Sequence, residues 1–204
     1  MALSADALCS LAQVKEYLRI SSSEHDAFLE GLIEAVSARF ASYTGRNLTA
    51  RDYSPDPEDE AYDPDNAILS GTGHPELILP QYPVITLSAL LLEGRAVAQA
   101  QSGGLTGWTL DRAAGVIRLL DQAFPLGAEN VQVTYRAGFE SVPPDLAQAA
   151  VEQSAVSFQE SAAGHGRLGI SARTLADGSV SYTQKTLLPQ VAAVLDRYLR
   201  RSLL

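Results

Sequence analysis

Apolar residues recur at helical spacing in four stretches of the chain. The stretches are residues 10–20, 24–44, 144–163 and 187–200. Gly45 follows the second stretch, and glycine just past a last turn commonly ends a helix. Ser21 and Glu24 have the spacing of a capping box at the start of this second stretch. We therefore expect four helices that pack through their apolar stripes as a small bundle.

Between the second and third of these stretches the pattern changes to short apolar runs bounded by turn residues. Val131, Val133 and Tyr135 alternate with polar residues, which is the period of a half-buried strand. Several such runs predict an inserted, mainly antiparallel β domain over residues 67–139, built as a small sheet or a barrel. Pro144 then suits the first turn of the third helix, where its missing N–H is not needed.

An acidic segment, residues 51–66, interrupts the apolar pattern. It carries seven carboxylates and three prolines, so we interpret it as an exposed, flexible loop. The alternative is a loop that binds a divalent cation, because carboxylate oxygens are hard ligands. The EF-hand spacing fails here, since Ala67 and Ile68 stand where a further ligand and a glycine belong.

The predicted fold class is α+β. A helical bundle with a C-terminal arm is formed by residues 1–50 and 140–204, the flexible acidic loop by 51–66 and the inserted β domain by 67–139. Asp177-Gly178 lies between two alternating runs and indicates a hairpin over residues 171–183. Both faces of this hairpin are polar, so we expect it to be mobile in the free subunit or stabilised by a neighbouring chain.

The composition and charge exclude some classes of function. The 204 residues include 19% charged and 46% hydrophobic residues, which is typical of a globular protein. A formal net charge of −9 repels the phosphate backbone, so we do not expect sequence-specific binding to a DNA duplex. The sequence contains no apolar run of about 18 residues and no N-terminal signal pattern, so we expect no membrane contact and a cytoplasmic origin.

Candidate chemistry is sparse. Cys9 is the single cysteine, and we expect it to be a small buried residue near the first helix. His25, His74 and His165 lie far apart and belong to no catalytic or metal-binding motif. Trp108 is expected to anchor the core of the sheet. We therefore predict no catalytic residue, no metal site and no cofactor.

Two helices carry candidate contact surfaces. The third predicted helix is rich in small residues, which allow close packing either between subunits or within one core; the candidates are Ala147, Ala150, Ser154, Ala155 and Phe158. The last helix has an apolar stripe and a basic end, and its candidates for an interface with another subunit or another protein are Leu187, Leu188, Val191, Val194, Leu195, Tyr198, Arg200 and Arg201.

Five segments, in order, resemble a known family, the head-tail connector (adaptor) proteins of long-tailed bacteriophages that form the first ring below the portal. The segments begin with Leu11-Ala12-Gln13-Val14-Lys15-Glu16-Tyr17-Leu18-Arg19-Ile20, continue with Tyr43-Thr44-Gly45-Arg46 and Tyr82-Pro83-Val84-Ile85-Thr86-Leu87, and end with residues 133–146 and the stretch from Leu188-Pro189 to Tyr198.

The resemblance implies a structural virion protein of the neck without catalysis. Such adaptors form a ring of about a dozen copies on the portal, extend the DNA channel and dock the stopper or tail-completion protein. They assemble in the host cytoplasm, contact the portal through their C-terminal segment and let DNA pass without sequence-specific binding. The alternatives are another neck or tail-completion protein and, from the carboxylates between Asp56 and Asp65, a metal-dependent hydrolase.

Overall fold

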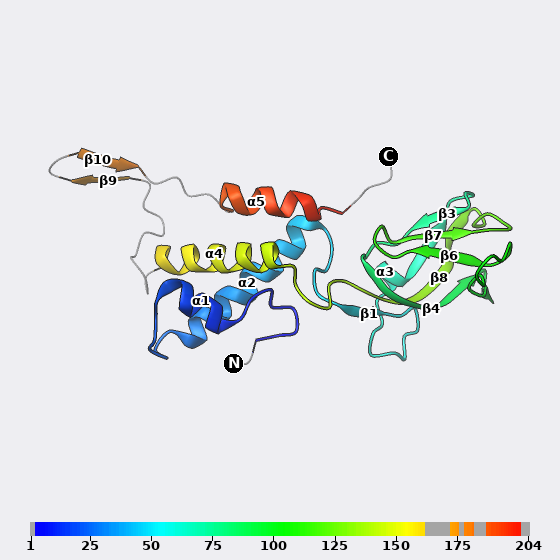
Figure 1. The fold of residues 1–204 in the computed structure, drawn as a ribbon, viewed down its shortest axis with the longest axis horizontal. Helices are drawn as coiled ribbons and strands as arrows, with labels where there is room; N and C mark the ends of the chain where they lie inside the picture. The colour runs from blue at the N-terminus through cyan, green and yellow to red at the C-terminus, as the bar shows by residue number, and fades with distance from the viewer. Residues whose placement is uncertain (1–2, 162–171, 176–177, 182–186, 201–204) are drawn as a thin grey trace. The chain divides into compact units, whose positions relative to one another are not determined.

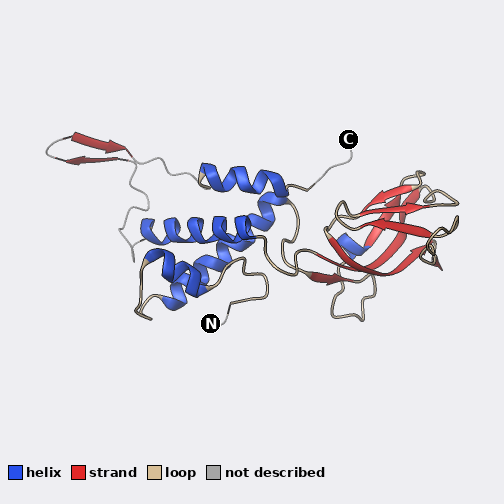
Figure 2. Ribbon diagram, in the orientation of Figure 1, coloured by secondary structure: helices blue, strands red, loops and turns tan. Residues whose placement is uncertain are grey.

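The chain folds into two compact units. The computed structural model describes residues 3–161, 172–175, 178–181 and 187–200. The first unit, here called the helical unit, consists of residues 1–45 and 142–204, and the second, the β unit, is the continuous segment 46–141. Figures 1 and 2 show helices in the one and mainly strands in the other. The α+β class predicted from the hydrophobic pattern is confirmed.

Helices from both ends of the chain build the helical unit (Figure 1). The described residues contain α1 (Leu11–Leu18), α2 (Asp26–Thr44), α4 (Pro144–Glu160), α5 (Pro189–Leu195) and the 3-10 helix η1 (Asp196–Tyr198). Helix α4 packs against α1, α2 and α5 and is therefore the centre of the bundle. The buried apolar stripe of α2 consists of Leu29, Ile33, Val36 and Phe40, at the predicted helical spacing.

The helix ends differ from the prediction at one point. The capping box belongs to α1, where Ser10 and Gln13 exchange hydrogen bonds, and not to Ser21 and Glu24 as predicted. Helix α2 begins later, at Asp26, after His25, whose side chain makes no capping hydrogen bond. Lys15 Nζ instead pairs with the Asp26 carboxylate at 2.6 Å, which ties the start of α2 to α1. The predicted terminator Gly45 is confirmed, with a φ of 68°.

A two-stranded hairpin follows α4 in the chain. Strands β9 (Ala172–Leu175) and β10 (Gly178–Ser181) pair antiparallel, with Leu175 opposite Gly178. The hairpin predicted for residues 171–183 is therefore confirmed, while Asp177, expected in its turn, lies outside the described residues. Its expected mobility in the free subunit stays a prediction, which amide hydrogen exchange would test.

Two antiparallel sheets form the β unit. The larger has the order β1 (Arg51–Tyr53), β8 (Gly127–Ala137), β4 (Val84–Leu92) and β5 (Arg95–Ala96), and β2 (Ile68–Gly71) also pairs with β8. The smaller consists of β3 (Glu76–Ile78), β7 (Val116–Leu119) and β6 (Trp108–Asp111). Of the two predicted forms, the sheet is therefore correct and the barrel is not.

Strand β8 is the central strand of the larger sheet. Val131, Val133 and Tyr135 are buried, and the polar residues between them are half-buried, which confirms the predicted alternation. Tyr135 stacks on Tyr53 of β1, with 5.0 Å between the ring centroids. Trp108 is buried in the same core and donates its indole N–H to the carbonyl of Val97 at 3.0 Å, so its prediction as a core anchor is confirmed.

The start and the end of the β unit lie against each other. Gly138 has a φ of 111°, and a Cβ atom there would lie 2.2 Å from the carbonyl oxygen of Thr49, so only glycine fits. The buried guanidinium of Arg46 donates to the carbonyl of Tyr82 at 2.6 Å and lies over the Tyr82 ring. The N–H of Phe139 donates to the carbonyl of Leu48 at 3.2 Å, and this backbone hydrogen bond holds the end of the β unit to its start.

The acidic segment has more structure than a loop. Its first residues form β1, which the sequence interpretation missed because Asp52 and the prolines that follow dominate the composition. Its last residues begin α3 (Pro64–Ala67), whose N-cap is Asp63. Tyr53 and Ser54 also make hydrogen bonds here. Part of the range predicted as a flexible loop is therefore ordered structure.

Candidate functional site

The C-terminal helix, which carries the predicted contact surface, is docked on its own subunit. Val191 and Leu195 are completely buried, and α5 packs against α4 and α2. The backbone N–H of Leu188 donates to the buried side chain of Gln153 at 3.0 Å. Two residues of the apolar stripe, Val191 and Leu195, therefore complete the core of the helical unit.

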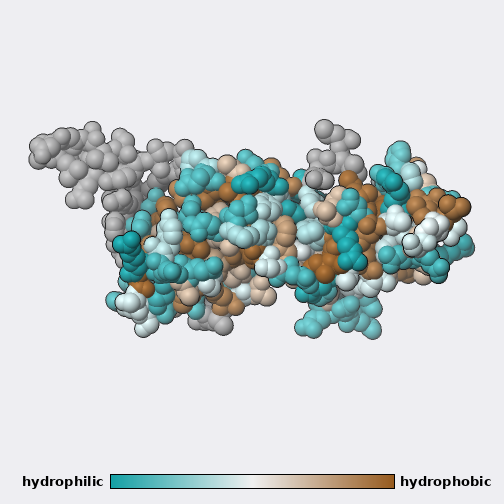
Figure 3. Space-filling view, in the orientation of Figure 1, coloured by the Kyte–Doolittle hydropathy of each residue, from teal (hydrophilic) through white to brown (hydrophobic). Residues whose placement is uncertain are grey.

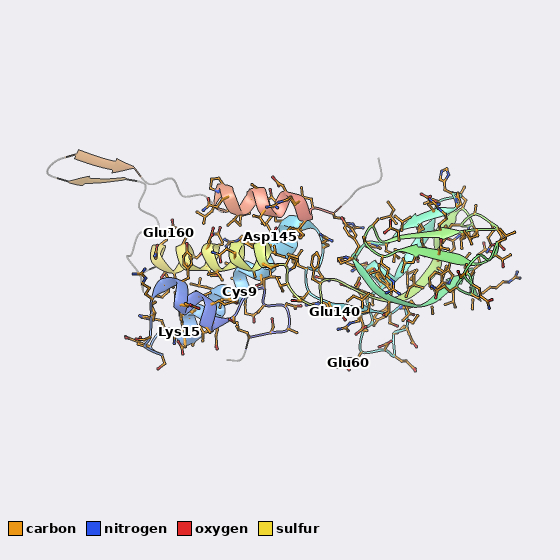
Figure 4. The ribbon with its side chains drawn as sticks, viewed as in Figure 1. Cys9, Lys15, Glu60, Glu140, Asp145 and Glu160 are labelled. Carbon is orange, nitrogen blue, oxygen red and sulfur yellow. The ribbon has the colours of Figure 1, made fainter. Side chains whose placement is uncertain are left out.

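Two tyrosine–aspartate hydrogen bonds hold the end of this helix. Tyr198 donates its hydroxyl to Asp145 at 2.7 Å, and Tyr43 donates to Asp196, also at 2.7 Å. Asp145 stands in the first turn of α4 (Figure 4) and also lies 3.6 Å from the guanidinium of Arg197. The hydrogen bond to Asp196 raises the pKa of Tyr43, because the carboxylate favours the protonated phenol.

The backbone extends this docking beyond η1. The N–H of Arg200 donates to the carbonyl of Thr44 at the end of α2, over 2.8 Å. Asp145 falls in the first turn of the helix predicted for residues 144–163, but nothing in the sequence indicates its partners. No local signal connects residues more than 50 positions apart, so this cluster required the tertiary structure.

The predicted interface residues of the C-terminal helix are thus divided between core and surface. Leu187, Leu188, Val194 and Tyr198 are half-buried, and Arg200 is exposed. Val191 and Leu195 are inaccessible while α5 stays docked. Arg201 lies outside the described residues. An apolar stripe shows that one helix face is covered but does not show by which partner, and here the partner is the subunit itself.

Helix α4 uses its small residues within the subunit. Ala150, Ser154, Ala155 and Phe158 are buried among the neighbouring helices. Of the two interpretations left open by the sequence, core packing therefore describes these four residues in this structure. Ala147 is half-buried and lines a shallow groove of about 410 Å³ between α1 and α4, together with exposed Tyr17 and buried Val151.

Cys9 lies in the same core, as predicted (Figure 4). Burial raises the pKa of its thiol to about 11, and the neighbouring hydroxyl of Ser154 offsets part of this shift. A thiol with this pKa is almost entirely protonated at neutral pH and is a poor nucleophile. Its chemistry is that of a packed apolar side chain.

The carboxylates of the acidic segment are used in local turns. Asp56 accepts from the N–H of Glu58, Asp59 from that of Ala61 and Asp63 from that of Asn66. The hydrogen bond from Ala61, with a second from Ser54, lowers the pKa of Asp59. In the part of the chain that the structure describes, no group of three or more His, Cys, Asp or Glu residues is arranged to hold a metal ion.

The two histidines that the structure describes belong to different units. The ring of His25 packs on Phe158, with 5.4 Å between their centroids, in the helical unit. His74 is exposed in the β unit, and its carbonyl accepts from Phe124. His165 lies outside the described residues. Among the described residues, no helix is long and apolar enough to cross a membrane.

Comparisons with known proteins give a family match and similar folds. A family model described as head completion protein matches residues 7–201. The fold is similar to that of a chain in the neck of an empty GTA particle computed with C6 symmetry, at 23% identity and a TM-score of 0.58, over 100% of this chain and 95% of that one. A chain in the neck of a native GTA particle computed with C12 symmetry gives 22% identity and a TM-score of 0.59, over 100% and 94%. A search of curated proteins finds no match.

Proposed function

We propose that this chain, which belongs to the head completion protein family and is a structural component of the head–tail connection, forms a ring on the portal. The ring extends the DNA channel and docks the stopper or tail-completion protein. The observation that carries this proposal is the family match over residues 7–201. The neck chains of similar fold come from particles computed with C6 and C12 symmetry, which supports a ring of about a dozen copies. Its location is the neck of a virion assembled in the host cytoplasm.

The charge of the molecule suits a channel through which DNA passes. A formal net charge of −9 repels the phosphate backbone. DNA can then move through the ring without sequence-specific binding. Salt-dependent retention of the ring on DNA would contradict this part of the proposal.

We assign the portal contact to the accessible part of the C-terminal segment. With α5 docked, the accessible candidates are Leu187, Leu188, Val194, Tyr198 and Arg200. Arg200 combines exposure with a positive charge at the end of the chain. Removing the whole segment from residue 187 would also remove Val191 and Leu195 from the core, so a point variant is the sharper test.

The experiment is a binding assay with purified portal. Wild-type protein should form rings or portal-capping oligomers in negative-stain images and mass photometry, and Arg200→Glu should weaken portal capping at least about tenfold, as expected for loss of a charged contact. Arg112→Glu reverses an exposed arginine of the β unit and is the matched control. A wild-type protein that stays monomeric with portal would contradict the proposed function.

A further inference from the structure

Two leucines stand almost entirely in solvent on the β unit. Leu105 is 84% exposed and Leu126 is 82% exposed, the highest values among the large apolar residues that the structure describes. Figure 3 shows hydrophobic residues, in brown, at the surface of this unit. A single exposed leucine is ordinary, but two on neighbouring loops form a candidate contact surface.

Backbone contacts support the loop of Leu105. Gly104 donates its N–H to the carbonyl of Gln101 at 2.8 Å. Gly107 has a φ of 93°, and a Cβ atom there would lie 2.6 Å from the carbonyl oxygen of Ala98, so the loop closes tightly against the chain before β6. Trp108, the next residue, is buried.

The loop of Leu126 is fixed in the same manner. Phe124 is completely buried, donates its N–H to the carbonyl of His74 at 2.9 Å and accepts from Gly73 at 3.1 Å. The carbonyl of Pro125 accepts from the side-chain amide of Asn130 at 2.9 Å. The next residue, Gly127, pairs with Gly71 of β2, so the backbone is anchored on both sides of Leu126.

The two loops are also joined to each other. Leu120 donates its N–H to the carbonyl of Gly107 at 3.0 Å, and Gly107 donates to the carboxylate of Asp121 at 3.3 Å. Both loops line one pocket of about 690 Å³. Because the backbone is already ordered, a partner that buries both leucines loses little conformational entropy on binding.

Charge identifies the kind of partner. The β unit has six arginines and thirteen acidic residues, a formal net charge of −7. Glu93 and Asp121 line the pocket with Arg95, and Glu129 lies close to the loop of Leu126 in the chain. This surface repels DNA and anionic lipid, and it favours a protein whose apolar pocket has a basic rim.

We propose that Leu105 and Leu126 are paired anchors by which the β unit docks the stopper or tail-completion protein, a partner that offers an apolar pocket bordered by basic residues. The inference rests on the proposed function and adds to it the surface that makes the contact. The sequence signal was weak: Leu105 follows Gly104, and Leu126 lies between Pro125 and Gly127, which are residues typical of turns.

Site-specific photo-crosslinking in assembled particles tests the contact directly. Benzoylphenylalanine at position 105 or 126 should give a covalent product with a neck protein other than the portal, identified by mass spectrometry. The same label at Tyr62, which is 45% exposed on the β unit, is the control and should give little of this product. Products with the portal, with DNA or with a second copy of this chain, or no product at all, would overturn the proposal.

A paired substitution tests the contribution of the leucines. Leu105→Ser with Leu126→Ser should reduce attachment of purified tails to portal-bound rings at least tenfold, as expected when two buried anchors are lost. Ring formation and Trp108 fluorescence should match those of Tyr62→Ser. Normal tail attachment by the paired variant would refute the inference while leaving the connector role intact, whereas absence of wild-type rings would refute the connector role itself. Flotation with vesicles containing phosphatidylglycerol should show no binding; binding that requires both leucines would also refute it.

Discussion

The helical unit and the β unit differ in how the chain assembles them. The helical unit joins residues 1–45 to residues 142–204, whereas the β unit is one continuous segment. Their formal net charges also differ, at −2 and −7. Contacts that close the helical unit connect residues far apart in sequence, such as Tyr198 with Asp145 and Tyr43 with Asp196.

This difference implies that the two units respond separately to perturbation. The β unit needs no residue outside its own segment to complete its core, so it can keep its structure when the bundle is weakened. Trp108 is the single tryptophan and lies in the β unit, so its fluorescence follows that unit alone. Circular dichroism at the helical band mainly follows the helical unit.

The largest effect is expected from a cavity in the bundle. Phe40→Ala removes a completely buried ring from α2 and should cost about 3–5 kcal/mol of the unfolding free energy of the helical unit. Urea titration followed by circular dichroism should show the loss, while the Trp108 transition stays in place. Coincident shifts of both signals would show that the two units unfold as one.

The second substitution destabilises the β unit, at the place where its end meets its start. Gly138→Ala places a methyl group against the Thr49 carbonyl at a positive φ and should cost about 2–3 kcal/mol, read from Trp108 fluorescence. Gly31→Ala is the control, because its methyl group meets no atom within 4 Å in α2. That control should stabilise the helical unit by up to about 1 kcal/mol. Equal effects of the two substitutions would contradict the structure.

The pH dependence of the helical unit offers a smaller effect. Since the pKa of Cys9 is about 11 in the folded state, above its ordinary value of 9.0, the stability due to the protonated thiol is present below pH 9 and is lost as the pH rises toward 11. Between pH 8 and 10.5, wild type should lose about 1–2 kcal/mol more than Cys9→Ala. Parallel pH curves for the two proteins would show that the thiol is accessible to solvent.

The smallest effect concerns the docking of the C-terminal helix. Tyr198→Phe removes the hydrogen bond to Asp145 and should cost about 1 kcal/mol of helical-unit stability, with faster amide exchange in α5. Tyr17→Phe changes an exposed tyrosine of the same unit and serves as the control. Unchanged exchange in α5 would indicate that Val191 and Leu195 dock the helix without help.

Local patterns were sufficient for most elements. The alternation around Val133 placed β8, and the spacing around Ile33 placed α2, because periodic burial is written directly into the sequence. The strand β1 was missed, since three residues next to an acidic, proline-rich run carry too little period to be recognised. Cys9 and Trp108 were correctly expected to be buried, because their size and polarity leave few alternatives.

The sequence by itself determined the fold class, the terminator at Gly45, the central strand and the order of segments that resembles the connector family. Only the tertiary structure decided which faces remain available for partners. Val191 and Ala150 are directed into their own subunit, whereas Leu105 and Leu126 are left in solvent. The physical reason is that periodicity specifies that a surface is to be covered, while the identity of the covering surface depends on contacts between residues distant in the chain.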